Sequence, residues 1–225
     1  MRFSLLILAL ALPAAASAQL APSSADIAGY TGLHRAAHLG DAALIRQLVA
    51  DGADLTVREA HGRTPVHVAA FASHEAAIAA LAEAGADMNA LEDGLYDAVT
   101  IAAVADDPEM LSAALAAGNR ADLVTSVYDG TALIAAAHLG HAEVVRRLIA
   151  AGAPLDHVNN LGWTALIEAV VLGDGGPAHV ATARALLEAG ADPDIPDRTG
   201  ATPLQLARQR GYAGMADLIA AHGGS

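Results

Sequence analysis

The chain has 225 residues, no cysteine, no lysine and a formal net charge of −13. The absence of cysteine excludes disulfides, thiolate zinc sites and a cysteine nucleophile. The acidic charge disfavours nucleic-acid phosphates and anionic membranes, and it fits a neutral or basic protein partner.

Residues 1–18 have the pattern of a secretory signal peptide. Arg2 precedes the short apolar run 3–12, Pro13 ends that run, and residues 16–18 (Ala-Ser-Ala) offer a cleavage site. The alternative, a membrane anchor, needs about 20 apolar residues and finds fewer here. We therefore predict export to the periplasm, or secretion as the alternative, and no membrane insertion after signal removal. Residues 19–25 are predicted to be a linker.

A repeated unit occupies the rest of the chain. Six successive units have equivalent residues at Thr31, Thr64, Asp97, Thr131, Thr164 and Thr202. The spacings between these residues are 33, 33, 34, 33 and 38. Such a period indicates a stacked repeat array. The predicted domain covers residues 26–225, with repeats at about 26–57, 58–90, 91–124, 125–158, 159–196 and 197–225.

Each unit predicts two helices. Thr64 is placed to cap a short first helix, with Pro65 in its first turn. A second helix follows, as in residues 142–151, and it stops at a Gly-Ala pair such as Gly152-Ala153. The third unit has lost the Thr-Pro start and is the predicted weak joint. The fifth unit carries a five-residue insertion within residues 173–178, predicted to be a longer loop between its helices.

These features resemble the ankyrin-repeat family, with Thr64-Pro65-Val66-His67 the closest copy of the family's Thr-Pro-Leu-His start. The resemblance covers residues 26–225. It implies an all-α solenoid of six helix-turn-helix repeats with short β-hairpin-like fingers. It also implies non-catalytic binding of a protein through the concave face formed by the fingers and first helices.

The family pattern also indicates which side chains would meet a partner. Five of the six Phe, Trp and Tyr residues after residue 18 fall at its concave positions, although an Ala, Leu, Val and Ile core has no need of that segregation. The alternative is that the rings fill gaps between fingers. The predicted partner-binding residues are Tyr30, His38, His61, Arg63, Phe71, Asp93, Tyr96, Tyr128, His138, Asn160 and Trp163.

Other chemistry finds weaker support. Ten histidines raise the hypothesis of metal or small-ligand binding, with His138 and His141 three residues apart, but their spacing matches no specific ligand set. No phosphate-binding loop, calcium loop or serine-hydrolase motif is present. We therefore predict no enzyme activity, no catalytic residues, no metal, no cofactor and a monomer. An inhibitor or protective partner of an envelope enzyme stays open as an alternative.

Overall fold

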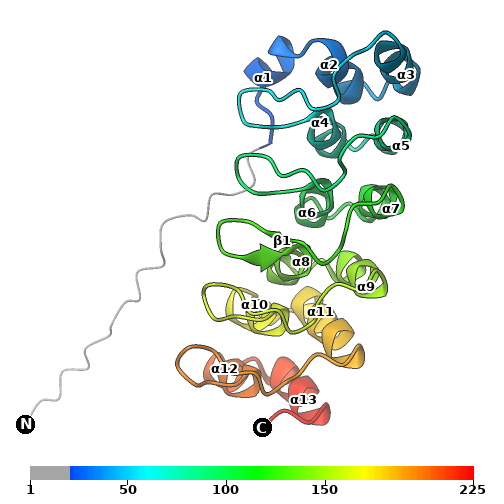
Figure 1. Cartoon of the computed structure of the whole chain (residues 1–225). Coiled ribbons are helices and arrows are strands. Elements are labelled where there is room, and N and C mark those ends of the chain that lie inside the picture. Colours follow the sequence, from blue (N-terminus) through cyan, green and yellow to red (C-terminus); the bar gives the residue numbers. More distant parts are fainter. Residues whose placement is uncertain (1–20) are drawn as a thin grey trace, which may run out of the picture.

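The computed structural model describes residues 21–225, which form six stacked layers of paired helices (Figure 1). The inner helices are α2 (Gly32–His38), α4 (Pro65–Phe71), α6 (Ala98–Val104), α8 (Ala132–Leu139), α10 (Ala165–Val171) and α12 (Pro203–Gln209). The outer helices are α3 (Ala42–Ala50), α5 (Glu75–Glu83), α7 (Pro108–Ala116), α9 (Ala142–Ala150), α11 (Pro177–Glu188) and α13 (Ala213–Ala221). The expected all-α solenoid of six repeats is confirmed.

The predicted signal segment lies outside the described residues. The predicted linker extended to Ala25, but a short helix, α1 (Ser24–Gly29), already begins at Ser24. The Ser23 hydroxyl accepts a hydrogen bond from the backbone N–H of Asp26, and the Asp26 carboxylate accepts one from the backbone N–H of Ser23 at 2.8 Å. This reciprocal capping satisfies two amides that a helix start leaves free. Within residues 21–225, no helix has the length and apolar character needed to cross a membrane.

The inner helices begin where the repeat pattern places them. The hydroxyls of Thr131, Thr164 and Thr202 each accept a hydrogen bond from the amide three residues later, at 3.3 Å. Thr31 also stands at a helix start, but its side chain makes no capping hydrogen bond. At the other end of α8, Gly140 has a φ of 76°, a left-handed conformation that costs glycine little.

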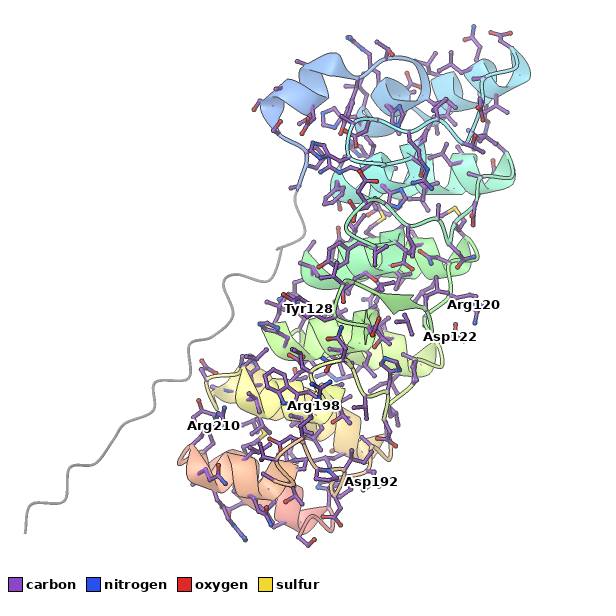
Figure 2. The ribbon with its side chains drawn as sticks, turned by 60° about the vertical axis from the view of Figure 1, so that its left-hand side comes forward. Arg120, Asp122, Tyr128, Asp192, Arg198 and Arg210 are labelled. Carbon is purple, nitrogen blue, oxygen red and sulfur yellow. The ribbon has the colours of Figure 1, made fainter. Side chains whose placement is uncertain are left out.

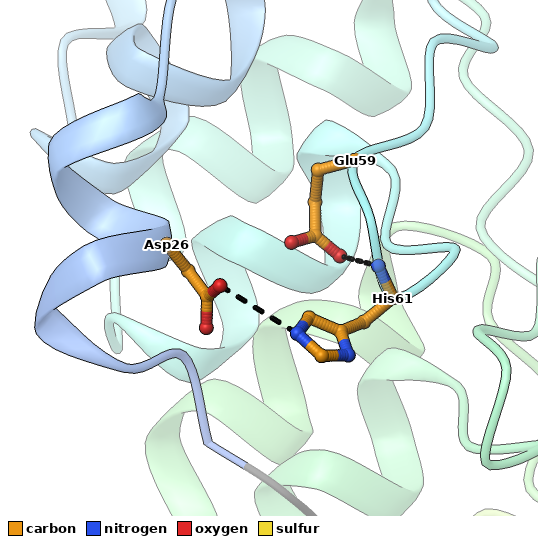
Figure 3. A group of neighbouring side chains, drawn as sticks. All are labelled: Asp26, Glu59 and His61. Atoms are coloured by element: carbon orange, nitrogen blue, oxygen red, sulfur yellow. Dashed lines mark hydrogen bonds and ion pairs between the residues drawn. The ribbon is translucent and has the colours of Figure 1, made fainter.

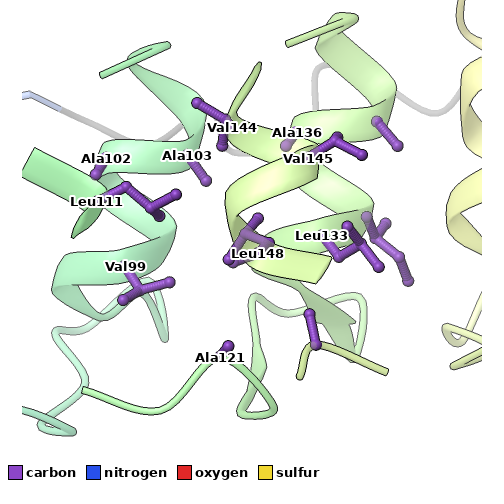
Figure 4. Close-up of a cluster of buried hydrophobic side chains, with 14 of the residues drawn as sticks. Val99, Ala102, Ala103, Leu111, Ala121, Leu133, Ala136, Val144, Val145 and Leu148 are labelled. Atoms are coloured by element: carbon purple, nitrogen blue, oxygen red, sulfur yellow. The ribbon is translucent and has the colours of Figure 1, made fainter. Parts of the chain in front are cut away.

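The core is built from small side chains that let neighbouring layers approach closely. Ala102 and Ala103 of α6 and Ala136 of α8 are buried where these inner helices pack together (Figure 4). The outer helix α9 contributes Val144 and Leu148, which are fully buried at helical spacing. Each layer thus buries its apolar face only against its neighbours, as in other repeat arrays.

The third layer is better tied than its sequence suggests. Asp97 replaces the usual threonine and still caps α6, because its carboxylate accepts the Thr100 amide at 2.7 Å. The buried Asn119 donates to Asp97 Oδ2 at 2.8 Å and accepts from the Val99 amide at 3.0 Å. The predicted weak joint therefore has its own buried polar network, which joins Asp97 and Asn119 to the start of α6.

The insertion in the fifth layer lies between the two helices, as expected, but not all of it is loop. The connection between α10 and α11 runs over residues 172–176, whereas α2 and α3 are joined by residues 39–41. Helix α11 has 12 residues, and the outer helices α3, α5, α7, α9 and α13 have 9 each. Two inserted residues therefore lengthen the loop and three lengthen the helix.

Candidate functional site: the concave face

Between successive layers the chain projects as fingers, all on the same side of the stack (Figure 1). One finger contains a short antiparallel ladder in the described residues, β1 (Val124–Thr125) with β2 (Gly130–Thr131). The tips are joined in a row by backbone hydrogen bonds. The amide of Asp93 donates to the carbonyl of His61 at 3.1 Å, that of Ser126 to Leu95 at 3.0 Å, and that of Asn160 to Tyr128 at 2.9 Å. These bonds fix each finger against the next.

Histidines fasten the fingers to the helices behind them. The backbone amide of Thr64 donates to His67 Nδ1 at 3.1 Å, so this nitrogen is unprotonated and Nε2 carries the proton. Nε2 then donates to the carbonyl of Tyr96 on the next finger, at 3.1 Å. Burial lowers the pKa of His67 to about 4, which keeps the ring neutral. His34 contacts the carbonyl of Arg63 in the same way, at 2.9 Å.

Two predicted contact residues are buried in the structure. Tyr30 is 4% exposed and Arg63 is fully buried, beneath α1. Nη1 of Arg63 lies 3.9 Å from Asp26 and 3.6 Å from Glu59, and its guanidinium stacks 5.3 Å from the centre of the Phe71 ring. Arg63 therefore has a structural role, and neither residue can meet a partner while α1 is in place.

The other predicted residues remain accessible to different degrees. The half-buried residues are His38, His61, Phe71, Tyr96, Tyr128 and Trp163. The exposed residues are Asp93, His138 and Asn160. Leu95 and Val127, at the tips of neighbouring fingers, are 42% and 48% exposed. These two residues were not predicted as contact residues, because an isolated apolar residue in a loop gives no sequence signal. Figure 2 turns the finger side forward and labels Tyr128 and Arg198 there.

A buried carboxylate lies on the inner-helix side of this face. Glu168 of α10 is 3% exposed, and its Oε1 accepts a hydrogen bond from Asn159 Nδ2 at 2.9 Å. Its Oε2 is buried without a hydrogen-bond partner and lies 3.5 Å from Nδ1 of His138. Burial raises the pKa of Glu168 to about 7, and burial also lowers the pKa of His138. Glu168 was not among the residues predicted from the sequence.

A sequence signal for Glu168 did exist. The residue five places before each repeat threonine or its equivalent is Asp26, Glu59, Glu92, Ser126, Asn159 and Asp197. Glu59 and Asp197 accept hydrogen bonds from backbone amides of their own fingers. Asn159 does the same through Oδ1, which accepts from the amides of Leu161 and Trp163 at 3.0 Å. An amide at this place can also donate, and Glu168 receives that bond. Asn159, which stands where most other units have an acid, therefore marks the unit whose inner helix contains the buried Glu168.

The described histidines are mostly engaged in joining layers. Nε2 of His74 lies 3.0 Å from the carbonyl of His38, and Nδ1 of His141 lies 2.9 Å from that of Ala103. His179 Nε2 lies 3.0 Å from the carbonyl of His138. The suggested pair of His138 and His141 is thus turned toward different partners, Glu168 and Ala103.

One group in residues 21–225 has the composition of a metal site. Asp26, Glu59 and His61 place ligand atoms within 4.8 Å of one another (Figure 3). His61 Nε2 lies 3.5 Å from Asp26, and its backbone amide donates to Glu59 at 2.8 Å. The Arg63 guanidinium lies against the same two carboxylates and already supplies positive charge. The group is therefore explained as an ion cluster that attaches α1.

This geometry defines a class of protein: a solenoid of paired helices that presents a preformed finger-lined face. A family model for ankyrin repeats in three copies matches residues 6–92 and 99–197. The chain belongs to the ankyrin-repeat family, as its repeat pattern predicts. Ankyrin repeats serve as protein-binding modules and are in general non-catalytic.

Relatives agree with this assignment. The chain is 42% identical over 97 residues to the ankyrin repeat protein YahD of Escherichia coli (strain K12), a match that spans 43% of this chain and 48% of YahD. The crystal structure of an ankyrin repeat domain from Acinetobacter baumannii AYE is 42% identical, with a TM-score of 0.79, covering 86% of this chain and 98% of the other.

A more distant structural neighbour shares the fold alone. It is a chain in the structure of the predatory endopeptidase Bd0816 from Bdellovibrio bacteriovorus in complex with immunity protein Bd3460. The identity is 23% and the TM-score 0.70, covering 85% of this chain and 98% of the other.

Proposed function

We propose that this chain is a non-catalytic binding protein whose concave face holds a neutral or basic protein partner. The observation that carries the proposal is the row of hydrogen-bonded finger tips, in which exposed Leu95 and Val127 directly precede half-buried Tyr96 and Tyr128 in the chain. Exposed apolar side chains beside aromatic rings are typical of interface centres. Burial of these apolar and aromatic side chains against a partner would supply binding free energy.

The fixed fingers also favour binding energetically. Three backbone hydrogen bonds join four successive finger tips, and the Arg198 side chain joins the last finger to the carbonyl of Asn160. The His67 bridge ties a finger to the helix behind it. A surface that is already ordered loses little conformational entropy when it meets a partner. The face can therefore act as one rigid template, and we propose that it does so as a monomer.

We also propose that the protein acts outside the cytoplasm, in the periplasm or after secretion. The support is the pattern of Arg2, the apolar run 3–12 and the small residues 16–18. Fractionation of bacterial cells producing the full chain, with N-terminal sequencing of the product, tests it. Export predicts a periplasmic or extracellular product beginning at Gln19, whereas an intact cytoplasmic chain would refute it.

A second candidate function is inhibition or protection of an envelope enzyme. The fold is shared with a chain from an endopeptidase–immunity protein complex, which makes an enzyme a reasonable kind of partner. The test is whether an enzyme bound by this chain changes its activity on binding. Binding with unchanged activity would leave simple recognition.

The remaining candidate is metal or small-ligand binding through histidines. Calorimetry with zinc or copper on the native chain and on a His138→Ala, His141→Ala variant tests it. Tight binding lost in the variant would favour this function over protein recognition.

The proposed function is tested by affinity capture. Residues 19–225 are immobilised beside a Tyr96→Ala, Trp163→Ala variant, and proteins retained from an envelope extract are identified by mass spectrometry. The proposal predicts a partner that the native face retains and the variant loses. A partner held equally by both would move the site to the convex side or to the loop 172–176.

A further inference from the structure

The inner helices and fingers at the centre of the concave face carry acidic groups of their own and no basic side chain other than histidine. The inner helices α4, α6, α8 and α10 and the finger segments 91–97, 124–131 and 157–164 contain no lysine or arginine. Asp93 and Asp129 are exposed on these fingers, and Glu168 is buried in α10. Three arginines reach this region from outside it and donate to backbone carbonyls: Arg58 to Leu91, Arg198 to Asn160 and Arg210 to Val171. Among the described residues, none of these arginines forms an ion pair with Glu168. A partner that matches this surface brings positive charge.

Glu168 is the most unusual of these groups. Natural proteins almost always pair a buried carboxylate, because an unpaired one is costly to desolvate. Asn159 satisfies Oε1, whereas Oε2 is buried with no hydrogen-bond partner. A carboxylate oxygen with open lone pairs beneath a binding face can receive a guanidinium or ammonium N–H.

The His138 side chain lies beside this oxygen. Its imidazole stands 3.5 Å from Oε2, beyond hydrogen-bond length, and its side chain is 44% exposed. In the described part of the chain, the His138 side chain makes no hydrogen bond. The ring can therefore turn away from Oε2 without breaking other polar contacts.

Trp163 belongs to the same constellation. The Asn159 side chain accepts the backbone amide of Trp163 at 3.0 Å while it donates to Glu168 at 2.9 Å. The ring is half-buried on the finger beside the inner helix. Aromatic faces attract cations, so a tryptophan ring on this finger adds to the attraction that the carboxylate offers.

We propose that Glu168, Asn159, His138 and Trp163 form a site on the concave face that receives one cationic side chain, arginine or lysine, of the protein partner. The proposal rests on the proposed protein-binding function and names the chemistry of its central contact. The cation displaces the His138 ring, takes a hydrogen-bonded ion pair with Oε2 and lies against Trp163.

The test uses a defined probe and a built-in reporter. Trp163 is the only tryptophan of the chain, so its indole N–H gives one identifiable NMR signal. Titration of the purified chain with N-acetylarginine amide should shift this signal and the Asn159 side-chain amide. N-acetylcitrulline amide, which has nearly the same shape but no charge, should leave both signals unmoved. Equal shifts from both probes would overturn the proposal.

Two variants complete the test. Glu168→Gln keeps the shape of the side chain and should reduce the affinity for arginine amide at least about tenfold, since it removes a charge-assisted hydrogen bond. Glu143→Gln, on exposed Glu143 of the outer helix α9, is the control for general charge attraction and should have no effect. Equal losses in both variants, or none in either, would overturn the proposal. Failure here, with partner capture still dependent on Tyr96 and Trp163, would refute this site and spare the proposed function.

Discussion

Replacement of Glu168 by glutamine should make the protein more stable at neutral and alkaline pH. The carboxylate is buried at 3% exposure beside a neutral imidazole and has one hydrogen bond, from Asn159. Glutamine keeps an acceptor for Asn159 and adds an N–H that can donate to His138. The variant thus retains the contacts and removes the cost of burying a charge.

The magnitude follows from the difference between the folded and unfolded proton affinities. Burial raises the pKa of Glu168 from 4.5 to about 7, so between these values the folded state binds more protons than the unfolded state. The free energy of unfolding therefore falls as the pH rises through this window, by about 3 kcal/mol in total. Glutamine does not titrate, so its advantage should be greatest at pH 8 and vanish below pH 4.5.

Urea unfolding of both proteins at pH 4.5, 6, 7 and 8, followed by circular dichroism, measures this difference. Taking the native chain and the variant at the same pH cancels groups that titrate in both. Glu143→Gln, which alters an exposed carboxylate paired with Arg146 and Arg147, should change the free energy of unfolding by less than about 1 kcal/mol at any pH. A Glu168→Gln variant that is no more stable at pH 8 than at pH 4.5, relative to the native chain, would refute the reasoning.

Three further changes have calculable effects. Asn119→Ala removes partners of the buried Asp97 carboxylate and should lower the urea stability by about 2–3 kcal/mol, whereas an unchanged midpoint would argue against the network. The pKa of His67 is lowered from 6.5 to about 4, so the unfolded chain takes up the proton first as the pH falls through that range. The free energy of unfolding should therefore fall by up to about 3 kcal/mol, and His67→Gln should lose this pH dependence in the same assay. Gly173→Ala should lower the melting temperature, because a Cβ would meet the carbonyl of Ala169, and a normal melting curve would contradict this packing.

Much of the fold could be read from local sequence signals. The repeat threonines mark the inner-helix starts because capping depends on residues only three places apart, as with Thr131 and Ile134. The Gly-Ala stops mark the outer-helix ends for the same reason. The short helix α1 was missed, although the pair Ser23 and Asp26 carried its capping signal.

The site was harder to predict because its properties depend on contacts between layers. Arg63 has the sequence position of a contact residue, and only the packing of α1 with Asp26 shows that it is buried. Glu168 has the sequence position of an ordinary inner-helix residue, and its environment comes from His138, 30 residues earlier in the chain. Burial and pairing of this kind are set by the fold, so a local pattern gives only an indirect sign of them.

The central claim is that the concave face binds a protein, and its most direct test is the affinity of the captured partner measured by calorimetry. The native chain is compared with Tyr96→Ala, Trp163→Ala on the concave side and with Glu143→Ala, Arg146→Ala on the outer helix α9. We predict at least about 30-fold weaker binding for the first variant, since interface aromatics carry much of the binding energy, and less than about twofold for the second. Undiminished binding by the concave variant, with loss in the α9 variant, would contradict the claim.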